Sequence, residues 1–187
     1  MRKTIQTFGM SLTFMALVVL GLGLPSANAM TAAEIDREAH STLVHLYANS
    51  ETARDFGAVA KGILVFPGVY KAGFLVGGQF GEGALLKNGK TAGYYNTVEA
   101  SYGLQAGAQK FGYVLFFMKD AALTYLDKSE GWEVGVGPSL VVVDAGFAKS
   151  MTTTTGKDDI YAFFVDQKGL MAGLGLKGSK ITRIHPD

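Results

Sequence analysis

The sequence predicts an α+β fold dominated by β-structure, with N-terminal amphipathic helices packed on a strongly curved antiparallel sheet or barrel. The first observation is a change of periodicity. Apolar side chains recur at helical spacing up to residue 60, and afterwards in short runs between turn residues. The second is a composition of 25 glycines, 12 phenylalanines and 8 tyrosines, which suits a β-rich domain with tight turns. The third is a glycine pattern that recurs in the β-rich part.

Residues 1–29 have the features of a secretory signal peptide. Arg2 and Lys3 precede an apolar run from Met10 to Leu24, and the segment ends in an Ala-x-Ala sequence at Ala29. A transmembrane anchor is the alternative, but the run is short for a bilayer span and is followed by small rather than basic residues. We therefore expect cleavage after Ala29 and an exported protein, periplasmic or secreted, that can be peripheral on a membrane.

The remaining residues, 30–187, are predicted to form a single domain. Removing 29 of the 187 residues leaves 158, which is enough to bury a sufficient core. The sequence contains no cysteine, which excludes disulfides and a lipoprotein anchor, since that anchor needs a cysteine at the cleavage point. The segment holds 15 basic and 16 acidic residues, which argues against a nucleic-acid partner because such modules usually carry a basic excess.

Two helices are predicted at the start of this domain. Thr31 and Glu34 have the spacing of a capping box, and apolar residues at helical spacing follow, which predicts a helix over 32–48. Ser50 begins a second helix, and Gly62 is expected to stop it. The apolar face of the first helix packs on the core by default, and its insertion into a membrane is the alternative.

The rest of the chain is predicted to contain about nine or ten short strands. Asn88-Gly89 is the sequence that a two-residue type I′ turn prefers, so a hairpin is expected there. A short helical turn is expected over 120–126 and a polar loop over 151–159. These strands are expected within the segments 63–66, which ends at Pro67-Gly68, 70–80, 84–87, 90–95, 100–109, 113–119, 132–136, 140–143, 160–165, 170–176 and 181–184.

The recurring pattern is Gly-apolar-x-small-Gly. On a strand, its two glycines would lie on the same face and leave that face nearly free of side chains. We therefore expect these positions to relieve crowding where the sheet bends or another backbone approaches closely. Helix packing through Gly-x-x-x-Gly is the alternative, which the β-branched and aromatic neighbours disfavour. The glycines are Gly73, Gly77, Gly103, Gly107, Gly169 and Gly173.

Each apparent catalytic motif in the sequence lacks a feature that its chemistry requires. The segment Gly83–Thr91 looks like a phosphate-binding loop, but five residues separate its glycines where four are required. Gly173–Gly178 matches a dinucleotide fingerprint by letter, but too few residues follow it to complete the unit. His40 and His45 lie five residues apart, on different faces of one helix, with no third ligand. We expect no catalytic residues, no metal and no cofactor; two close carboxylates in a deep pocket would revive an enzyme hypothesis.

Lysines that border aromatic stretches favour a contact surface instead. At a membrane interface the lysine stem lies along acyl chains while its ammonium meets phosphate, and aromatic rings enter the same layer. The alternative is that the aromatic residues form the core and the lysines its rim. The predicted lipid-binding residues are Lys61, Phe66, Tyr70, Lys71, Phe74, Lys110, Phe111 and Lys119.

Several motifs together closely resemble the SYLF domain, also called the Ysc84 or DUF500 family. They are Ala60–Pro67, Lys71–Phe74, Gly77–Gly83, Ser101–Gly107, and Tyr161 with Gly169–Gly173. They occur in family order and span nearly all of the chain after residue 29. The resemblance implies lipid binding. Eukaryotic members bind phosphoinositides, and some bind actin alongside an SH3 domain. This chain has no SH3 domain and an export signal, so we do not expect actin as its partner.

These observations lead to one hypothesis and one alternative. The hypothesis is a non-enzymatic, phospholipid-surface-binding module of the bacterial cell envelope. The alternative is a structural or protein-partner-binding envelope protein, whose apolar surface would face another protein. Binding to liposomes would distinguish the two.

Overall fold

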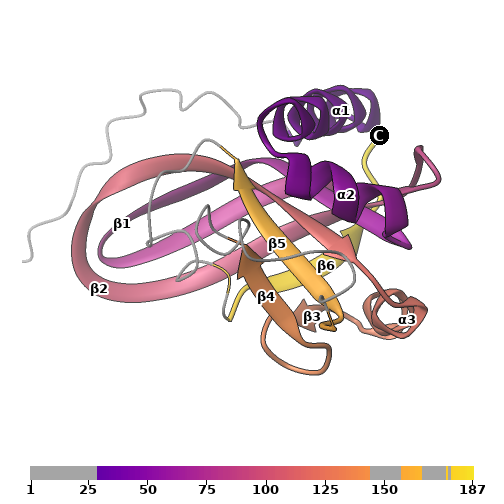
Figure 1. The fold of residues 1–187 in the computed structure, drawn as a ribbon. Helices are drawn as coiled ribbons and strands as arrows, with labels where there is room; N and C mark the ends of the chain where they lie inside the picture. The colour runs from indigo at the N-terminus through magenta and orange to yellow at the C-terminus, as the bar shows by residue number, and fades with distance from the viewer. Residues whose placement is uncertain (1–28, 144–156, 166–175, 177) are drawn as a thin grey trace, which may run out of the picture.

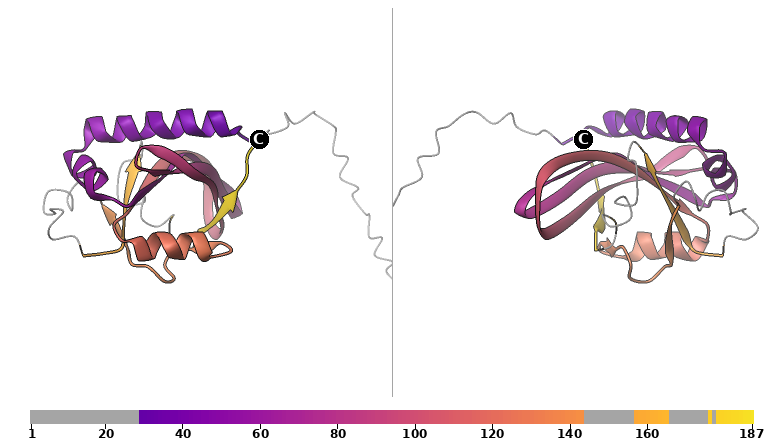
Figure 2. Two further views of the ribbon diagram at one scale, coloured as in Figure 1. Left: turned by 90° about the vertical axis from the view of Figure 1, so that its right-hand side faces the viewer. Right: turned by 60° about the vertical axis from the view of Figure 1, so that its left-hand side comes forward.

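The computed structural model describes residues 29–143, 157–165, 176 and 178–187. For 73–76 and 101–107 it describes the backbone but not the side chains. Residues 1–28 of the predicted signal peptide, nearly all of the predicted strand 170–176, and Gly169 and Gly173 lie outside the described residues. Within them, helices α1 and α2 precede a curled sheet, and α3 lies on the side of that sheet opposite α1 (Figures 1 and 2).

The two predicted N-terminal helices are confirmed. α1 spans Ala32–Asn49, and its capping box is complete: Glu34 N–H donates to Thr31 Oγ1 at 3.3 Å, and Thr31 N–H donates to Glu34 Oε2 at 2.8 Å. α2 spans Glu51–Val59 and is capped by Ser50, whose hydroxyl accepts from Ala53 N–H at 3.1 Å. Each cap satisfies backbone N–H groups that have no partner within the helix.

The expectation that Gly62 stops the second helix is wrong. α2 ends three residues earlier, at Val59, and Gly62 is the first residue of a strand. Gly62 is buried beside Leu123, whose Cδ2 would lie 2.9 Å from a Cβ at this position. The residue therefore provides space for packing rather than a helix cap.

The main element of the sheet is one long antiparallel hairpin. β1 spans Gly62–Lys87 and β2 spans Lys90–Phe117. Asn88 and Gly89 join them with φ values of 53° and 73°, as a type I′ turn requires, so the predicted turn is confirmed. The segments predicted as separate strands between 63 and 117 are continuous in the structure. Pro67-Gly68, expected to end a strand, lies instead at a register shift between Phe66 and Val69.

In the described part of the chain, four shorter strands join this hairpin in the sheet. They are β3 (Trp132–Glu133), β4 (Leu140–Val143), β5 (Ile160–Val165) and β6 (Lys180–Ile184), and α3 (Asp120–Lys128) precedes them. β2 pairs with β1 along one edge, while its other edge pairs with β6 over 94–98 and with β5 over 112–117. The pairings between these described strands are antiparallel except that between β4 and β5. The predicted antiparallel sheet under N-terminal helices is thus confirmed, with this one parallel edge.

The hairpin is bent back on itself, so that β1 forms two limbs (Figure 1). Gly81 and Gly83 on the second limb lie against the first limb. A Cβ on Gly81 would be 2.9 Å from the Gly68 carbonyl oxygen, and one on Gly83 would clash with the Val65 carbonyl oxygen. Close approach between the limbs therefore requires glycine at these two positions. Gly73 pairs with Gly107 at a further register shift, in the middle of the strands, where the repeated pattern was expected to serve a bend.

The sheet has a core on each face. The inner core lies within the curl, between the limbs, β5, β6 and α3, and includes Leu64, Phe66, Val69, Leu85, Tyr95, Phe111, Tyr113, Phe117, Leu123 and Trp132. The outer core lies between the sheet and α1 and α2, and includes Ile35, Ala39, Leu46, Phe56, Val65, Ala84, Leu86, Phe116 and Tyr161. Alternate residues of one strand thus serve two cores.

Candidate functional site

An aromatic ring and a lysine lie together on the outside of the hairpin. Tyr70 follows the fully buried Val69 and points to the opposite face, where its side chain is 59% exposed. Lys110 is its direct partner on β2, and the ammonium lies 5.1 Å from the centroid of the Tyr70 ring. This cation–π contact holds a positive charge beside an exposed aromatic side chain.

A second exposed apolar pair lies on the other limb. Phe80 and Val98 are direct partners in the ladder and are 47% and 45% exposed. Phe80 follows the buried Gln79, so it also points away from the inner core. Gly78 and Ala100, the next pair toward the bend, are exposed as well. We call Tyr70, Phe80, Val98 and Lys110 the hairpin outer face.

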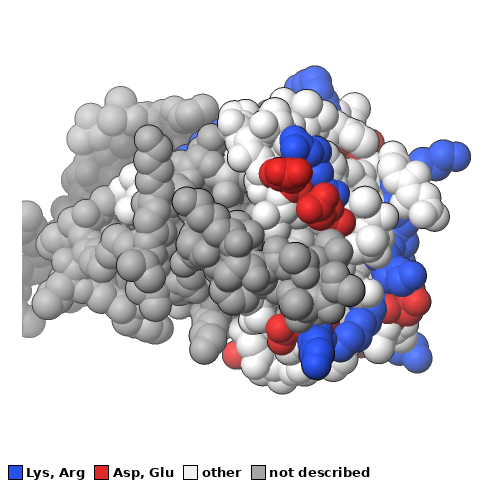
Figure 3. All heavy atoms as spheres, in the orientation of Figure 1, with Lys and Arg blue, Asp and Glu red and all other residues white. Residues whose placement is uncertain are grey.

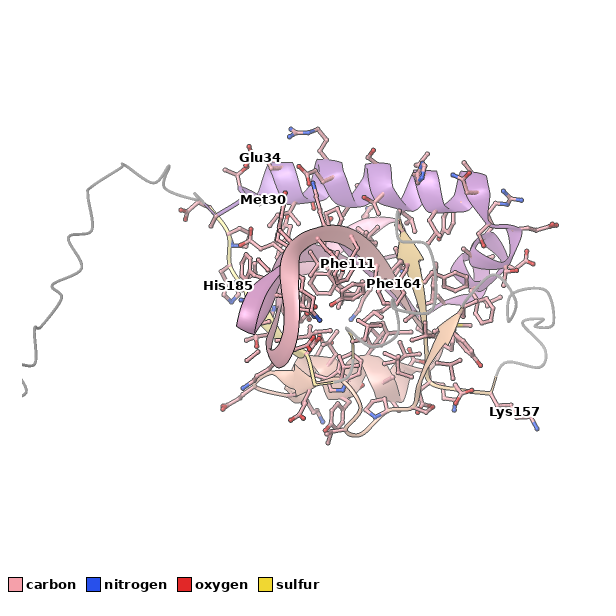
Figure 4. All side chains as sticks on the ribbon, turned by 90° about the vertical axis from the view of Figure 1, so that its left-hand side faces the viewer. Met30, Glu34, Phe111, Lys157, Phe164 and His185 are labelled. Atoms are coloured by element: carbon pink, nitrogen blue, oxygen red, sulfur yellow. The ribbon has the colours of Figure 1, made fainter. Side chains whose placement is uncertain are left out.

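Two of the predicted contact residues are in the inner core. Phe66 is 0% exposed and Phe111 is 3% exposed. Phe66 packs on Tyr113 with ring centroids 4.8 Å apart, and Phe111 packs on Phe164 at 5.9 Å, inside the curl (Figure 4). In this structure both rings pack within the protein and do not reach a surface. The description of Phe74 covers its backbone but not its side chain.

The predicted lysines do not form one patch. Lys61 and Lys119 are exposed but lie where β1 begins and β2 ends, roughly 30 Å along the strand from Tyr70. Lys119 also pairs with Asp159 at 2.8 Å. On the face drawn in Figure 3, acidic and basic side chains are interspersed over this end of the molecule. Only Tyr70 and Lys110, of the eight predicted residues, are brought together on an exposed surface among the described side chains.

Lys71 belongs to a polar cluster on the inner side of the hairpin. Gln79 Nε2 donates to Ser179 Oγ at 2.9 Å, and the Ser179 hydroxyl donates to Glu99 Oε2 at 3.3 Å. Burial raises the pKa of Glu99, while the positive charge of Lys71 opposes this rise. Sequence reasoning missed the cluster because Ser179 lies 80 residues from Glu99 along the chain. The cross-strand pairing of Gln79 with Glu99 was the one local signal.

Burial also affects a neighbouring tyrosine in the curl. Tyr113 is fully buried, and this desolvation raises the pKa of its hydroxyl far above the ordinary range. The side chain therefore stays neutral. Its environment explains the shift without a catalytic role, since the aromatic rings of Phe66, Phe111 and Phe164 surround it.

α1 presents its apolar face to the sheet. Ile35, Ala39 and Leu46 are buried, and Asp36 accepts hydrogen bonds from Thr91 Oγ1 at 2.8 Å and Tyr94 Oη at 3.1 Å. Insertion of this face into a membrane would require the helix to leave the sheet. No helix in the described residues is long and apolar enough to cross a bilayer. In the same residues, no three His, Cys, Asp or Glu side chains are placed to hold a metal.

Comparison with protein families identifies part of the chain. Residues 98–185 match the family model Ysc84, which is described as "Las17-binding protein actin regulator". This match covers 88 of the 187 residues and shows that this part of the chain is similar to the Ysc84 family. The Ysc84 (SYLF) family consists of lipid- and protein-binding domains. The Ysc84 match begins in β2 at Val98 and continues into β6, so it includes Lys110 but not Tyr70 or Phe80. No curated protein matches the sequence.

Proposed function

We propose that the protein is a non-enzymatic module that binds phospholipid surfaces through the hairpin outer face. The observation that carries this proposal is the exposed Tyr70 ring beneath the Lys110 ammonium. A tyrosine has an apolar ring and a polar hydroxyl, and a lysine has an apolar stem and a cationic end. Both therefore suit the headgroup layer of a membrane. Phe80 and Val98 add an apolar pair without a polar atom.

The proposed binding is weak and depends on membrane composition. Transfer of one aromatic side chain from water contributes about 1.5–3 kcal/mol when burial is complete. Tyr70 and Phe80 are already about half covered, so each contributes less. One lysine near an anionic surface adds about 1 kcal/mol. The sum favours peripheral, reversible association that is stronger on anionic vesicles and weaker at high salt.

The proposal includes export. Residues 1–29 would direct the chain out of the cytoplasm and be removed, leaving a periplasmic or secreted protein. In that compartment actin is not available, although the family description names an actin regulator. The membrane or another protein of the bacterial envelope is then the partner that the hairpin outer face can meet.

Vesicle co-sedimentation of residues 30–187 tests this function. We expect binding to vesicles that contain anionic phospholipid, and less binding to purely zwitterionic vesicles. Binding should also be weaker at 0.5 M salt, where the Debye length is about one third of its value at 0.05 M. Tyr70→Ser and Lys110→Glu should each reduce binding. The matched controls Tyr125→Ser and Lys90→Glu change exposed residues of the same types elsewhere and should leave it unchanged.

Three results would contradict the proposal. One is the absence of binding to every vesicle composition at low salt. The second is equal loss of binding in the controls, which would mean that no particular surface is used. The third is lipid-independent recovery of the chain in a stable complex with an envelope protein, disrupted by Tyr70→Ser. That outcome would assign the hairpin outer face to a protein partner instead.

A further inference from the structure

A buried carboxylate lies beneath the start of α1. Glu82 is only 9% exposed, and Met30 N–H donates to its Oε2 at 3.0 Å. Neither salt bridge found in the described part of the chain, Lys87–Asp127 or Lys119–Asp159, includes it. A buried, ionised carboxylate is costly unless a cation or several hydrogen bonds compensate its charge. Figure 4 shows Met30 at the beginning of α1, next to the curved hairpin.

Asn96 supplies a second acceptor at the same place. It is the direct ladder partner of Glu82, so the two side chains share one face of the hairpin. Asn96 Oδ1 is buried and accepts no hydrogen bond within the described residues. A buried acceptor without a donor carries a free-energy cost. One negative charge and one unused acceptor therefore lie on the hairpin face that Met30 reaches with a single N–H.

Met30 is also the residue that follows the expected cleavage point. Hydrolysis of the Ala29–Met30 peptide bond by a signal peptidase consumes one water molecule. It leaves a carboxylate on Ala29 and a free amine on Met30, which takes up a proton because an α-amino group has a pKa of about 7.7–8.0. We propose that the α-ammonium created by this cleavage binds Glu82, with Asn96 Oδ1 as a further acceptor. Processing then installs a buried ion pair that the precursor lacks.

Because this ammonium lies at the N-terminus of a helix, the proposal predicts whether the free amine raises or lowers the stability of the fold. Positive charge at the N-terminus of a helix opposes the helix dipole and destabilises it. Glu34, the acidic residue in the first turn of α1, already accepts hydrogen bonds from Thr31 in the capping box. A free amine on Met30 would therefore lower the stability of the fold unless Glu82 binds it. If the free amine instead stabilises the fold, the helix dipole cannot be the cause, and the ion pair with Glu82 explains the result.

The test compares three forms of the chain by thermal unfolding at pH 7. The first begins at Met30 with a free amine, the second is acetylated on that amine, and the third retains Asn28 and Ala29. Each is released from an N-terminal fusion, and its first residue is verified by mass spectrometry. We expect the free-amine form to have a Tm several degrees above the other two. Glu82→Gln should remove this difference or reverse it.

A matched variant and a second readout complete the test. Glu133→Gln removes an exposed carboxylate elsewhere and should leave the difference unchanged. The Met30 amine should also react with an acylating reagent at least tenfold more slowly in the folded chain than after Glu82→Gln. An equal or lower Tm for the free-amine form would overturn the proposal, as would an advantage that persists in Glu82→Gln. If Glu82→Gln does not fold, the comparison of free and acetylated forms still decides.

Discussion

Two regions of the β1–β2 hairpin, its open end and the bend in its middle, differ in what covers them, although the same two strands build both. Where β1 begins and β2 ends, every residue from Phe111 to Phe117 is buried between the two cores. Toward the bend, Tyr70, Phe80 and Val98 are about half exposed. Phe66 and Phe80 are the same residue type on the same strand, yet they are 0% and 47% exposed. Whether an aromatic residue of the hairpin packs in a core or lies on a candidate binding surface therefore depends on the helices and strands that cover it, and not on its residue type.

The largest expected effect separates these two roles directly. Phe66→Ala removes a fully buried ring and leaves a cavity, so it should lower the free energy of unfolding by about 3–5 kcal/mol. Phe80→Ala removes a half-exposed ring and should cost less than about 1 kcal/mol. Urea denaturation measures both. In vesicle binding by the folded variants the order should invert, with Phe80→Ala losing more. A binding loss confined to Phe66→Ala would break the comparison.

A smaller effect is expected from the glycines on the second limb. Gly83→Ala places a methyl group against the Val65 backbone carbonyl, which cannot move without shifting β1, so we expect a loss of about 2–3 kcal/mol. Among the described atoms, Gly78→Ala, closer to the bend, would meet only the Glu99 carbonyl oxygen at 3.3 Å and should cost less than about 1 kcal/mol. Chemical denaturation of both variants tests the difference. Equal losses would mean that contact between the limbs does not decide the effect.

The local parts of this architecture could be predicted from the sequence. The Thr31–Glu34 capping box and the Asn88-Gly89 turn depend on residues within a few positions of one another, and both are confirmed. The length of β1 could not be predicted in this way, because Pro67-Gly68 normally ends a strand. Here it lies at a register shift, and pairing with distant β2 residues continues the strand. Local turn propensity was overridden by a long-range ladder.

The candidate site was predictable only in part for a related reason. Tyr70 with Lys110 and Phe66 with Phe111 all come from aromatic stretches bordered by lysine, so the sequence pattern is the same. The face on which each residue lies depends on the register shift at Pro67 and on the curl of the sheet. Lys71 turns inward, where its charge acts on Glu99, for the same reason. None of these faces can be assigned before the register is known.

The open end and the bend should also respond to pH with opposite signs. Hydrogen bonding by Lys119 and Ser139 lowers the pKa of Asp159, so this group stabilises the fold at neutral pH, and its contribution is lost as pH falls through the folded-state pKa. Burial raises the pKa of Glu99, so its ionisation opposes folding at neutral pH. That cost is relieved as pH falls through its own raised pKa.

Two isosteric variants measure this contrast. At pH 7, Asp159→Asn should lower the free energy of unfolding by less than about 1 kcal/mol, because the pair with Lys119 is partly exposed. Glu99→Gln should raise it. Denaturation curves between pH 3 and pH 7, about the range in which carboxyl groups titrate, should show both differences shrinking toward acid. A Glu99→Gln variant that is less stable at pH 7 would show that the inner polar cluster stabilises the bend.

The smallest effect concerns the hairpin outer face in the absence of a membrane. The cation–π contact between Lys110 and Tyr70 is exposed, so a double-mutant cycle with Lys110→Met and Tyr70→Leu should give a coupling of about 0.5 kcal/mol. Lys110→Met keeps the stem of the side chain and removes only the charge. A measurable coupling means that the protein already holds the ring and the ammonium together before any lipid is present, so less ordering is needed on binding. Zero coupling would mean that a membrane has to bring them together, and the bend would then differ from the covered end in order as well as in exposure.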